Sequence, residues 1–202
     1  MAGRKGRLDL SRVLIIDLEA TCWQGPRPPD QEPEVIEIGN AILHVASLQV
    51  EPGPELLVRP VRSTVSEFCT ELTTLTQDVL DARGISFAEA LDALSEAHGD
   101  IRRIVWASYG EYDRGKLTEE CDHYAIPFPL GATHVNLKRL TALAAGWERE
   151  RGMAGAMRGL GLEPTPGSTH HRGADDAVNI ARIAALVLGG FRGAMTQKAP
   201  MP

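Results

Sequence analysis

The sequence has few cysteines, and no uninterrupted apolar run approaches the length of a membrane span. Its three cysteines, Cys22, Cys69 and Cys121, are widely spaced and form no Cys-x-x-Cys pair. This spacing argues against a zinc site and a disulfide framework, and it predicts three buried free thiols in a reducing compartment. The basic stretch 1–7 leads into no apolar segment, so we expect no secretory signal, no membrane association and a soluble, cytoplasmic protein.

An excess of basic charge is also missing. Lys and Arg number 21 against 27 Asp and Glu, which gives a net charge of -6. Such a balance argues against a basic surface that grips long duplexes. It still allows a protein that binds a short stretch of nucleic acid through a local groove and cations, because carboxylates that hold cations count toward the acidic total.

What the chain does have is enough apolar sequence for one sizeable core, since 43% of its 202 residues are hydrophobic. We predict a polar, flexible arm over 1–9, a single domain over 10–190 and a frayed tail over 191–202. The sequence shows neither an internal repeat nor a second domain.

Apolar and alternating patterns predict strands early in the chain and helices later. The strands are expected over about 12–19, 34–43, 55–59, 104–107 and 133–137. Short connections between the first three indicate an antiparallel meander, while the later strands alternate with helices. This order predicts an α/β protein whose mixed sheet combines the meander with parallel strands and is flanked by helices.

Helical patterns begin near residue 64. One helix starts at the capping box that joins Ser86 to Glu89, and it closes at Gly99. The other main helices are expected around 116–121, 138–145, 152–160 and from about 174 onward.

The stretch from Val13 to Glu19 carries the first chemical signal. Four apolar residues read as a strand buried on both faces, and Asp17 and Glu19 follow at its end. Side chains alternate along a strand, so the two carboxylates project from the same face. Like charges this close are costly beside apolar surroundings unless a cation lies between them, and hard divalent cations prefer oxygen ligands. The plain alternative is two solvated acids at a strand end.

Two further acids stand at similar junctions. Asp113 comes just after a buried strand, at the start of a helix, and Asp176 lies in the first turn of the last helix, five positions after His171. Taken singly, an Asp in a first helical turn is explained by the helix macrodipole. A lone histidine is equally ordinary on a surface.

The joint pattern is more specific. Five segments match in order: Asp17-Leu-Glu-Ala-Thr-Cys-Trp23, Glu34-Val-Ile-Glu-Ile-Gly39, Phe68-Cys-Thr-Glu-Leu-Thr73, Val135-Asn-Leu-Lys138 and His171-Arg-Gly-Ala-Asp-Asp-Ala-Val-Asn-Ile-Ala-Arg182. Together they resemble the DEDDh branch of the DnaQ-like 3′–5′ exonucleases, closest to the Eri-type and KapD-like group. The resemblance covers about residues 12–188 and implies an RNase H-like fold.

The resemblance also implies a role for each residue. Two divalent cations, Mg²⁺ or Mn²⁺, would be held by carboxylates, because such a pair can activate water and stabilise the leaving 3′ oxygen. Asp17 would bridge both metals, Glu19 and Asp176 would complete the metal on the side of the nucleophilic water, and Asp113 would support the second. His171 would contact the substrate and act as general base, which its ordinary pKa near neutrality suits.

His171 is preferred to its neighbour His170 because only His171 has the spacing to Asp176 that the family pattern requires. The adjacent Asp175 is set aside, since its helical offset points it elsewhere. The histidines lie in a loop rich in proline and glycine, which we expect to be mobile until metals and substrate are present.

In the resembled group, a base-stacking pair and backbone groups beside the first acidic motif grip the terminal nucleotide. Phe68 and Leu72 match the pair and share one face if helical. Backbone N–H groups around Ala20, Thr21 and Trp23 are expected to meet the terminal 3′ hydroxyl. The alternatives are that Phe68 is ordinary core and that Trp23 is a lid on the core.

The function expected from this resemblance is a metal-dependent 3′–5′ exonuclease that releases nucleoside monophosphates. Single-stranded RNA or RNA 3′ overhangs are the favoured substrates, with DNA left open. One alternative is a phosphatase, because Asp17-Leu-Glu-Ala-Thr21 echoes the motif of haloacid-dehalogenase-type enzymes; its expected later Lys and Gly-Asp pair are not apparent. Another is a non-catalytic nucleic-acid-binding relative.

Overall fold

The computed structural model describes residues 7–196. Residues 1–6 and 197–202, and with them most of the predicted arm and the end of the predicted tail, lie outside the described residues. The strands are β1 (Asp9–Ala20), β2 (Val35–His44), β3 (Val50–Pro52), β4 (Ile104–Ser108) and β5 (His134–Asn136). The helices are α1 (Glu67–Thr73), α2 (Gln77–Arg83), α3 (Phe87–His98), α4 (Tyr112–His123), α5 (Leu137–Ala144), α6 (Met153–Gly159) and α7 (Gly173–Thr196), with a 3₁₀ turn η1 (Ile101–Arg103).

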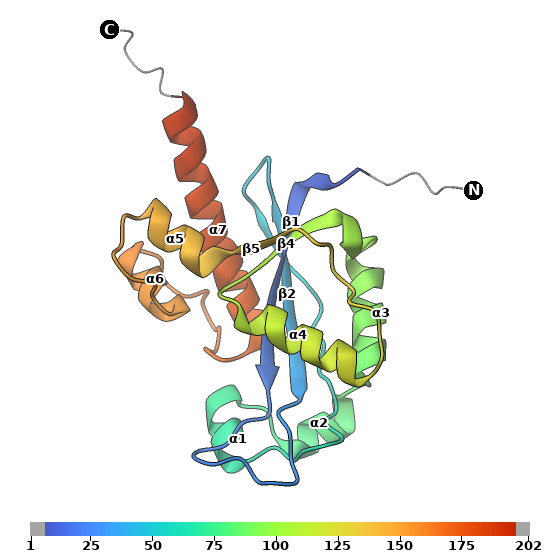
Figure 1. Cartoon of the computed structure of the whole chain (residues 1–202). Helices are drawn as coiled ribbons and strands as arrows, with labels where there is room; N and C mark the ends of the chain where they lie inside the picture. Colours follow the sequence, from blue (N-terminus) through green and yellow to red (C-terminus); the bar gives the residue numbers. More distant parts are fainter. Residues whose placement is uncertain (1–6, 197–202) are drawn as a thin grey trace, which may run out of the picture.

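The strands form one mixed sheet in the order β3-β2-β1-β4-β5. β1 pairs antiparallel with β2 and parallel with β4, β3 extends the antiparallel edge, and β5 extends the parallel edge. This confirms the predicted α/β class with an RNase H-like mixed sheet. Figure 1 shows α3 and α4 on one side of the sheet and α7, with α5 and α6, on the other.

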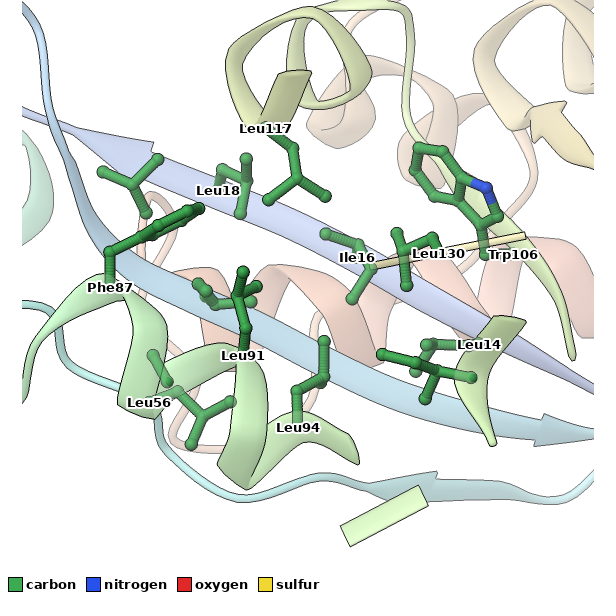
Figure 2. Packing of buried hydrophobic residues seen from close by; sticks show 14 of the residues in the cluster. Leu14, Ile16, Leu18, Leu56, Phe87, Leu91, Leu94, Trp106, Leu117 and Leu130 are labelled. Carbon is green, nitrogen blue, oxygen red and sulfur yellow. The ribbon is translucent and has the colours of Figure 1, made fainter. Parts of the chain in front are cut away.

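β1 is central because it buries residues on both faces. Leu14, Ile16 and Leu18 pack with α3, α4 and β4 in one apolar cluster (Figure 2). Ile15 belongs to a second cluster on the α7 side. Because strand side chains alternate, the residues that continue the Ile15 face toward the end of β1 are Asp17 and Glu19. The core thus aims both carboxylates toward the helix α7.

The third strand differs from the prediction. Residues 55–59 form only isolated bridges, and β3 lies earlier, at Val50–Pro52. The predicted segment still runs beside β2, since Ile38 N–H donates to Leu56 and Val58 N–H donates to Ile36. Prolines stand on both sides of it, and a proline cannot donate to a ladder, so the pairing stays short. The capping box of α3 is present as predicted.

The last helix is longer than predicted. α7 continues to Thr196, so the part of the expected tail that is described is helical rather than frayed. Arg192 donates hydrogen bonds to the carbonyls of Val45 and Ala46, which holds the far end of α7 against the β2–β3 turn. Likewise, β1 already begins at Asp9, inside the predicted arm.

By length and composition alone, α7 is long and apolar enough to cross a membrane, contrary to the expectation from the sequence. The core helix of a globular protein passes the same test. Here the residues Ile180, Ala181 and Ala184 pack on the sheet, and Asp176 lies in the first turn.

The start of α7 lies unusually close to β2. A Cβ atom on Gly39 would come within 1.9 Å of the Gly173 backbone, and one on Gly173 within 3.0 Å of Gly39 N. Gly39 has no room for a side chain and Gly173 has little, so this pair of glycines lets the helix begin directly on the sheet.

We therefore expect Gly39→Ala to destabilise the protein by about 3 kcal/mol or more, because the clash is with backbone that cannot move aside. Gly115→Ala is the matched control: Gly115 is exposed within α4, its Cβ would meet nothing within 4 Å, and the change should stabilise by up to about 1 kcal/mol. Urea unfolding measures both. Equally small changes in the free energy of unfolding for both variants would show that β2 and α7 leave room for a side chain at Gly39.

Candidate active site

Four carboxylates from three separate elements line one open cleft of about 420 Å³. Asp17 and Glu19 come from the end of β1, Asp113 from the first turn of α4, and Asp176 from the first turn of α7. Ligand oxygens of Asp17, Glu19 and Asp176 all lie within 4.8 Å of one another. Asp113 is tied to the same strand, because its Oδ1 accepts a hydrogen bond of 3.0 Å from Leu18 N–H. The residues that sequence reasoning singled out separately are therefore neighbours.

Burial raises the pKa values of all four carboxyl groups, and mutual repulsion adds to this at Asp17 and Glu19, so these groups resist ionisation when no cation is bound. Desolvation, followed by the charges of Asp113 and Glu19, raises the pKa of Asp17 well above its ordinary value. Burial, and then the repulsion of like charges, that of Asp176 the strongest, raises the pKa of Glu19 to about 8. Burial also raises the pKa of Asp113 to about 6 and that of Asp176 above its ordinary value. Positive charge placed among them would reverse this penalty.

The donor set fits hard divalent cations. It consists of carboxylate oxygens, the ligands that Mg²⁺ and Mn²⁺ prefer. The Asp176 Oδ1 atom is buried and accepts no hydrogen bond from the described residues, which leaves it free as a ligand. Asp17, Glu19 and Asp176 would hold a cation where their oxygens converge, and Asp113 would contribute from the opposite wall.

Two histidines stand over Asp176. His171 donates its backbone N–H to Asp176 Oδ2 at 2.9 Å, and the Nδ1 atom of His170 lies 3.0 Å from the same oxygen. The two rings stack with centroids 3.9 Å apart, and both residues line the cleft. His171 adopts a left-handed backbone conformation with φ of 64°. Burial, and then the charge of His170, lowers the pKa of His171.

Sequence reasoning chose His171 over His170, and the structure brings both to the cleft. In this arrangement the ring nearest the Asp176 carboxylate belongs to His170, while His171 contacts that carboxylate through its backbone. Asp175 is turned away from the cleft acids, as expected, and accepts the N–H of Thr169.

A buried glutamate that sequence reasoning gave no role anchors this region. Glu37 on β2 is fully buried and accepts hydrogen bonds from the N–H groups of Gly173 at 3.0 Å and Ala174 at 3.2 Å. It also pairs with Arg172, the residue after His171. From its place on β2, Glu37 thus accepts hydrogen bonds from the first N–H groups of α7, which have no partner within the helix. An acid inside the apolar segment around Ile36 and Ile38 was the available signal.

The predicted substrate contacts divide into two groups. Ala20 and Leu72 line the cleft, as does His171. Phe68, one turn before Leu72 on α1, is half-buried and belongs to none of the apolar clusters formed by residues 7–196, so it is not ordinary core. Trp23 is half-buried outside the set of cleft-lining residues.

The expectation for Thr21 needs correction. Its backbone N–H already donates to the Glu34 carbonyl at 2.9 Å, and its hydroxyl accepts from Glu34 N–H and bonds to Ser63. Thr21 is buried and holds the loop after β1, so its N–H is engaged rather than free for a substrate. Cys22 departs from the expected full burial as well, since it is half-buried at the cleft wall.

Other residues of the cleft were given no role from the sequence, although Lys138 ends one of the matched motifs. They are Tyr109, Tyr112, Lys138, Gly152 and Met153. Tyr112 had a signal in its position directly before Asp113, and its side chain is 60% exposed. Gly152 and Met153 come from the start of α6, which no motif connected to the acids.

The mixed sheet and the four converging carboxylates beside a histidine loop are the arrangement of the DEDDh family. The family model described as Exonuclease (RNase_T) matches residues 14–184, and the chain belongs to this family. Its relatives support a DEDDh 3′–5′ exonuclease of the Eri type, as the motifs indicated.

Among curated relatives, 3'-5' exoribonuclease 1 of Rattus norvegicus is 32% identical over 187 residues, covering 87% of this chain and 52% of that protein. ERI1 exoribonuclease 2 of Xenopus laevis is 26% identical over 208 residues, covering 91% of this chain and 29% of that protein. The chain therefore spans about half, or less, of the length of these relatives.

Among solved structures, the nuclease domain of 3'hExo, a DEDDh family member bound to rAMP, superposes with a TM-score of 0.77 at 29% identity. The match covers 89% of this chain and 92% of that one. Cell-death related nuclease 4 (CRN-4) has a TM-score of 0.73 at 17% identity, covering 89% of this chain and 64% of that one, and shows the shared fold.

The raised pKa of Glu19 predicts how stability depends on pH. Without divalent cations, the folded protein keeps a proton on Glu19 up to pH of about 8, whereas the unfolded chain releases it near pH 4.5. The folded state thus binds more protons in this window, so the free energy of unfolding should fall as pH rises through it. Added Mg²⁺ or Mn²⁺ binds the ionised acids and should raise Tm more at pH 8 than at pH 6.

Thermal unfolding with EDTA or metal measures this. Glu19→Gln should flatten the pH dependence and reduce the stabilisation by metal, while Asp175→Asn, next to Asp176 but outside the cleft, should change neither. Metal stabilisation of equal size in wild type and Glu19→Gln would contradict the assignment.

Removal of Glu37 tests the anchor of α7. Glu37→Ala leaves two helix N–H groups and part of the Arg172 guanidinium without a buried partner, so we expect a loss of about 2–4 kcal/mol in the free energy of unfolding. Glu55→Ala removes the more exposed carboxylate on Arg172 and should cost about 1 kcal/mol or less. Urea midpoints compare the two, and equal costs would argue against an anchoring role.

Proposed function

We propose that this chain is a metal-dependent 3′–5′ exoribonuclease that hydrolyses the terminal phosphodiester of RNA and releases 5′-mononucleotides. The observation that carries the proposal is the convergence of Asp17, Glu19 and Asp176 within 4.8 Å, with Asp113 and the histidine loop on the same cleft. The rat relative, 3'-5' exoribonuclease 1, has this polarity and substrate class, which supports the proposal.

Two divalent cations, Mg²⁺ or Mn²⁺, are proposed as cofactors. When bound, such a pair lowers the pKa of the attacking water and stabilises the departing 3′ oxygen. Asp17, whose carboxylate lies within 4.8 Å of those of Glu19 and Asp176, would be shared between them. Glu19 and Asp176 would hold one cation, and Asp113 would support the other.

His171 is proposed as the general base. The lowered pKa keeps its imidazole neutral near neutral pH, so it can accept the proton that the attacking water loses. For this, its ring must face the water, while the backbone bond to Asp176 keeps the loop near the acids. His170 lies close enough to compete for the role, and variants of each separate the two.

Recognition of the terminal nucleotide is proposed to use the α1 side of the cleft. Leu72 lines the cleft and Phe68 precedes it by one turn on the same helix. An aromatic and an aliphatic side chain can sandwich a base without selecting its sequence, with stacking worth about 1–3 kcal/mol. Single-stranded RNA or a 3′ overhang could reach this pair, and DNA remains a second substrate class for the assay to decide.

The decisive measurement follows 3′- and 5′-labelled RNA and DNA oligonucleotides, with and without EDTA. Shortening from the 3′ end with release of 5′-mononucleotides, abolished by EDTA, is expected. A phosphatase would instead release inorganic phosphate, and this alternative also conflicts with membership of the Exonuclease family. No hydrolysis by the wild type with either metal would favour the non-catalytic alternative.

Single substitutions should separate the roles. Asp17→Asn removes a charge that both cations are proposed to share and should abolish turnover. His171→Ala should reduce kcat by about 10²–10⁴, the usual contribution of a general base, while leaving stabilisation by metal intact. A larger loss in His170→Ala than in His171→Ala would transfer the base to His170, and full activity of Asp17→Asn would end the site assignment.

A further inference from the structure

One basic side chain, that of Lys138, lines the cleft that contains the four carboxylates. Lys138 lies in the first turn of α5 and is half-buried, and within residues 7–196 it is the only Lys or Arg that lines the cleft. Its stem runs past the loop that leads to Asp113, since a Cβ on Gly110 would come within 3.9 Å of Lys138 Cδ. Lys138 therefore lines the cleft beside the loop that leads into α4.

Lys138 is unpaired although carboxylates stand nearby. Among residues 7–196, no carboxylate oxygen lies within the 4.0 Å that defines an ion pair with its ammonium. The other described lysine, Lys116, is buried and pairs with Glu119 and Glu120. Arg139, the next residue along α5, pairs with Glu150. A positive charge kept free beside a negative cleft remains available for an incoming anion.

We propose that Lys138 binds a backbone phosphate of the RNA strand, namely the phosphate immediately 5′ of the one that is cleaved. This inference rests on the proposed function. The cations held by the four acids would neutralise the cleaved phosphate. For the next phosphate along the strand, the described part of the cleft offers no Lys or Arg other than Lys138. An ammonium on a flexible stem suits a phosphate whose position shifts as the strand advances.

The expected effect is on binding and its salt dependence. Lys138→Gln should raise KM for a single-stranded RNA of ten nucleotides about tenfold, with kcat within about twofold, because one charge-assisted hydrogen bond is lost. The slope of log Kd against log salt should decrease in magnitude by about 0.7, the value for one phosphate contact on a single strand. Lys138→Arg should recover most of the affinity, and Arg139→Gln is the neighbouring control that should change neither quantity.

Chemically altered substrates locate the contact. A methylphosphonate at the second phosphate, counted from the 3′ end, removes the charge that Lys138 is proposed to bind. It should weaken binding to the wild type much more than binding to Lys138→Gln. The same change at the fourth phosphate should affect both proteins equally. A dinucleotide without a 5′ phosphate lacks the proposed contact, so its kcat/KM should fall less in Lys138→Gln than that of a trinucleotide.

Strand binding is measured by fluorescence anisotropy with EDTA as well as by turnover, so this test does not depend on hydrolysis. If the wild type hydrolyses no RNA but still binds the strand more tightly than Lys138→Gln does, the phosphate contact is kept and the proposed activity is rejected. An unchanged salt slope, or equal losses with the dinucleotide and the trinucleotide, would overturn the proposal for Lys138. Unfolding midpoints of the variants verify that they are folded.

Discussion

Repulsion between carboxylates is the constraint on which this structure depends. Asp17, Glu19, Asp113 and Asp176 approach one another in partly buried surroundings, and their raised pKa values express the cost. A flexible scaffold would relieve that cost by letting the acids move apart. Here β1 resists, because it is packed on both faces and hydrogen-bonded on both edges. The rigidity of the central strand is thus a requirement of the site and not only of the fold.

Rigidity alone does not bring the C-terminal acid to the cleft. α7 must start against the sheet, and a helix start there leaves N–H groups without partners. Two features of β2 resolve this. Gly39 lets the backbones approach, and Glu37 accepts the first N–H groups of the helix. Asp176 and the histidine loop are placed by residues more than 130 positions earlier in the chain, which explains why a local pattern cannot reveal the arrangement.

The sequence predicts features that depend on neighbouring residues, but it does not reveal contacts between residues that are far apart in the chain. The strand that carries Asp17 and Glu19 was readable, because burial and alternation are local patterns. The position of Asp176 beside them needed the family resemblance. The roles of Glu37 and Thr21 depend on hydrogen bonds to distant backbone groups, so their residue types gave little indication. The third strand was misplaced for a similar reason, since pairing with β2 depends on where flanking prolines allow a ladder.

The acidic net charge is consistent with a protein that handles nucleic acid, provided that affinity comes from the site and not from the surface. A basic surface would hold RNA along its length and slow the release that each cycle of terminal cleavage requires. Arg172, which follows the histidine loop, already pairs with Glu37 and Glu55. Attraction for phosphate would then come from the cations that the four acids would hold and, as proposed, from Lys138, the only Lys or Arg among the cleft-lining residues within 7–196. An acidic protein of this kind would favour a strand end that can enter the cleft over a duplex that can only touch the surface.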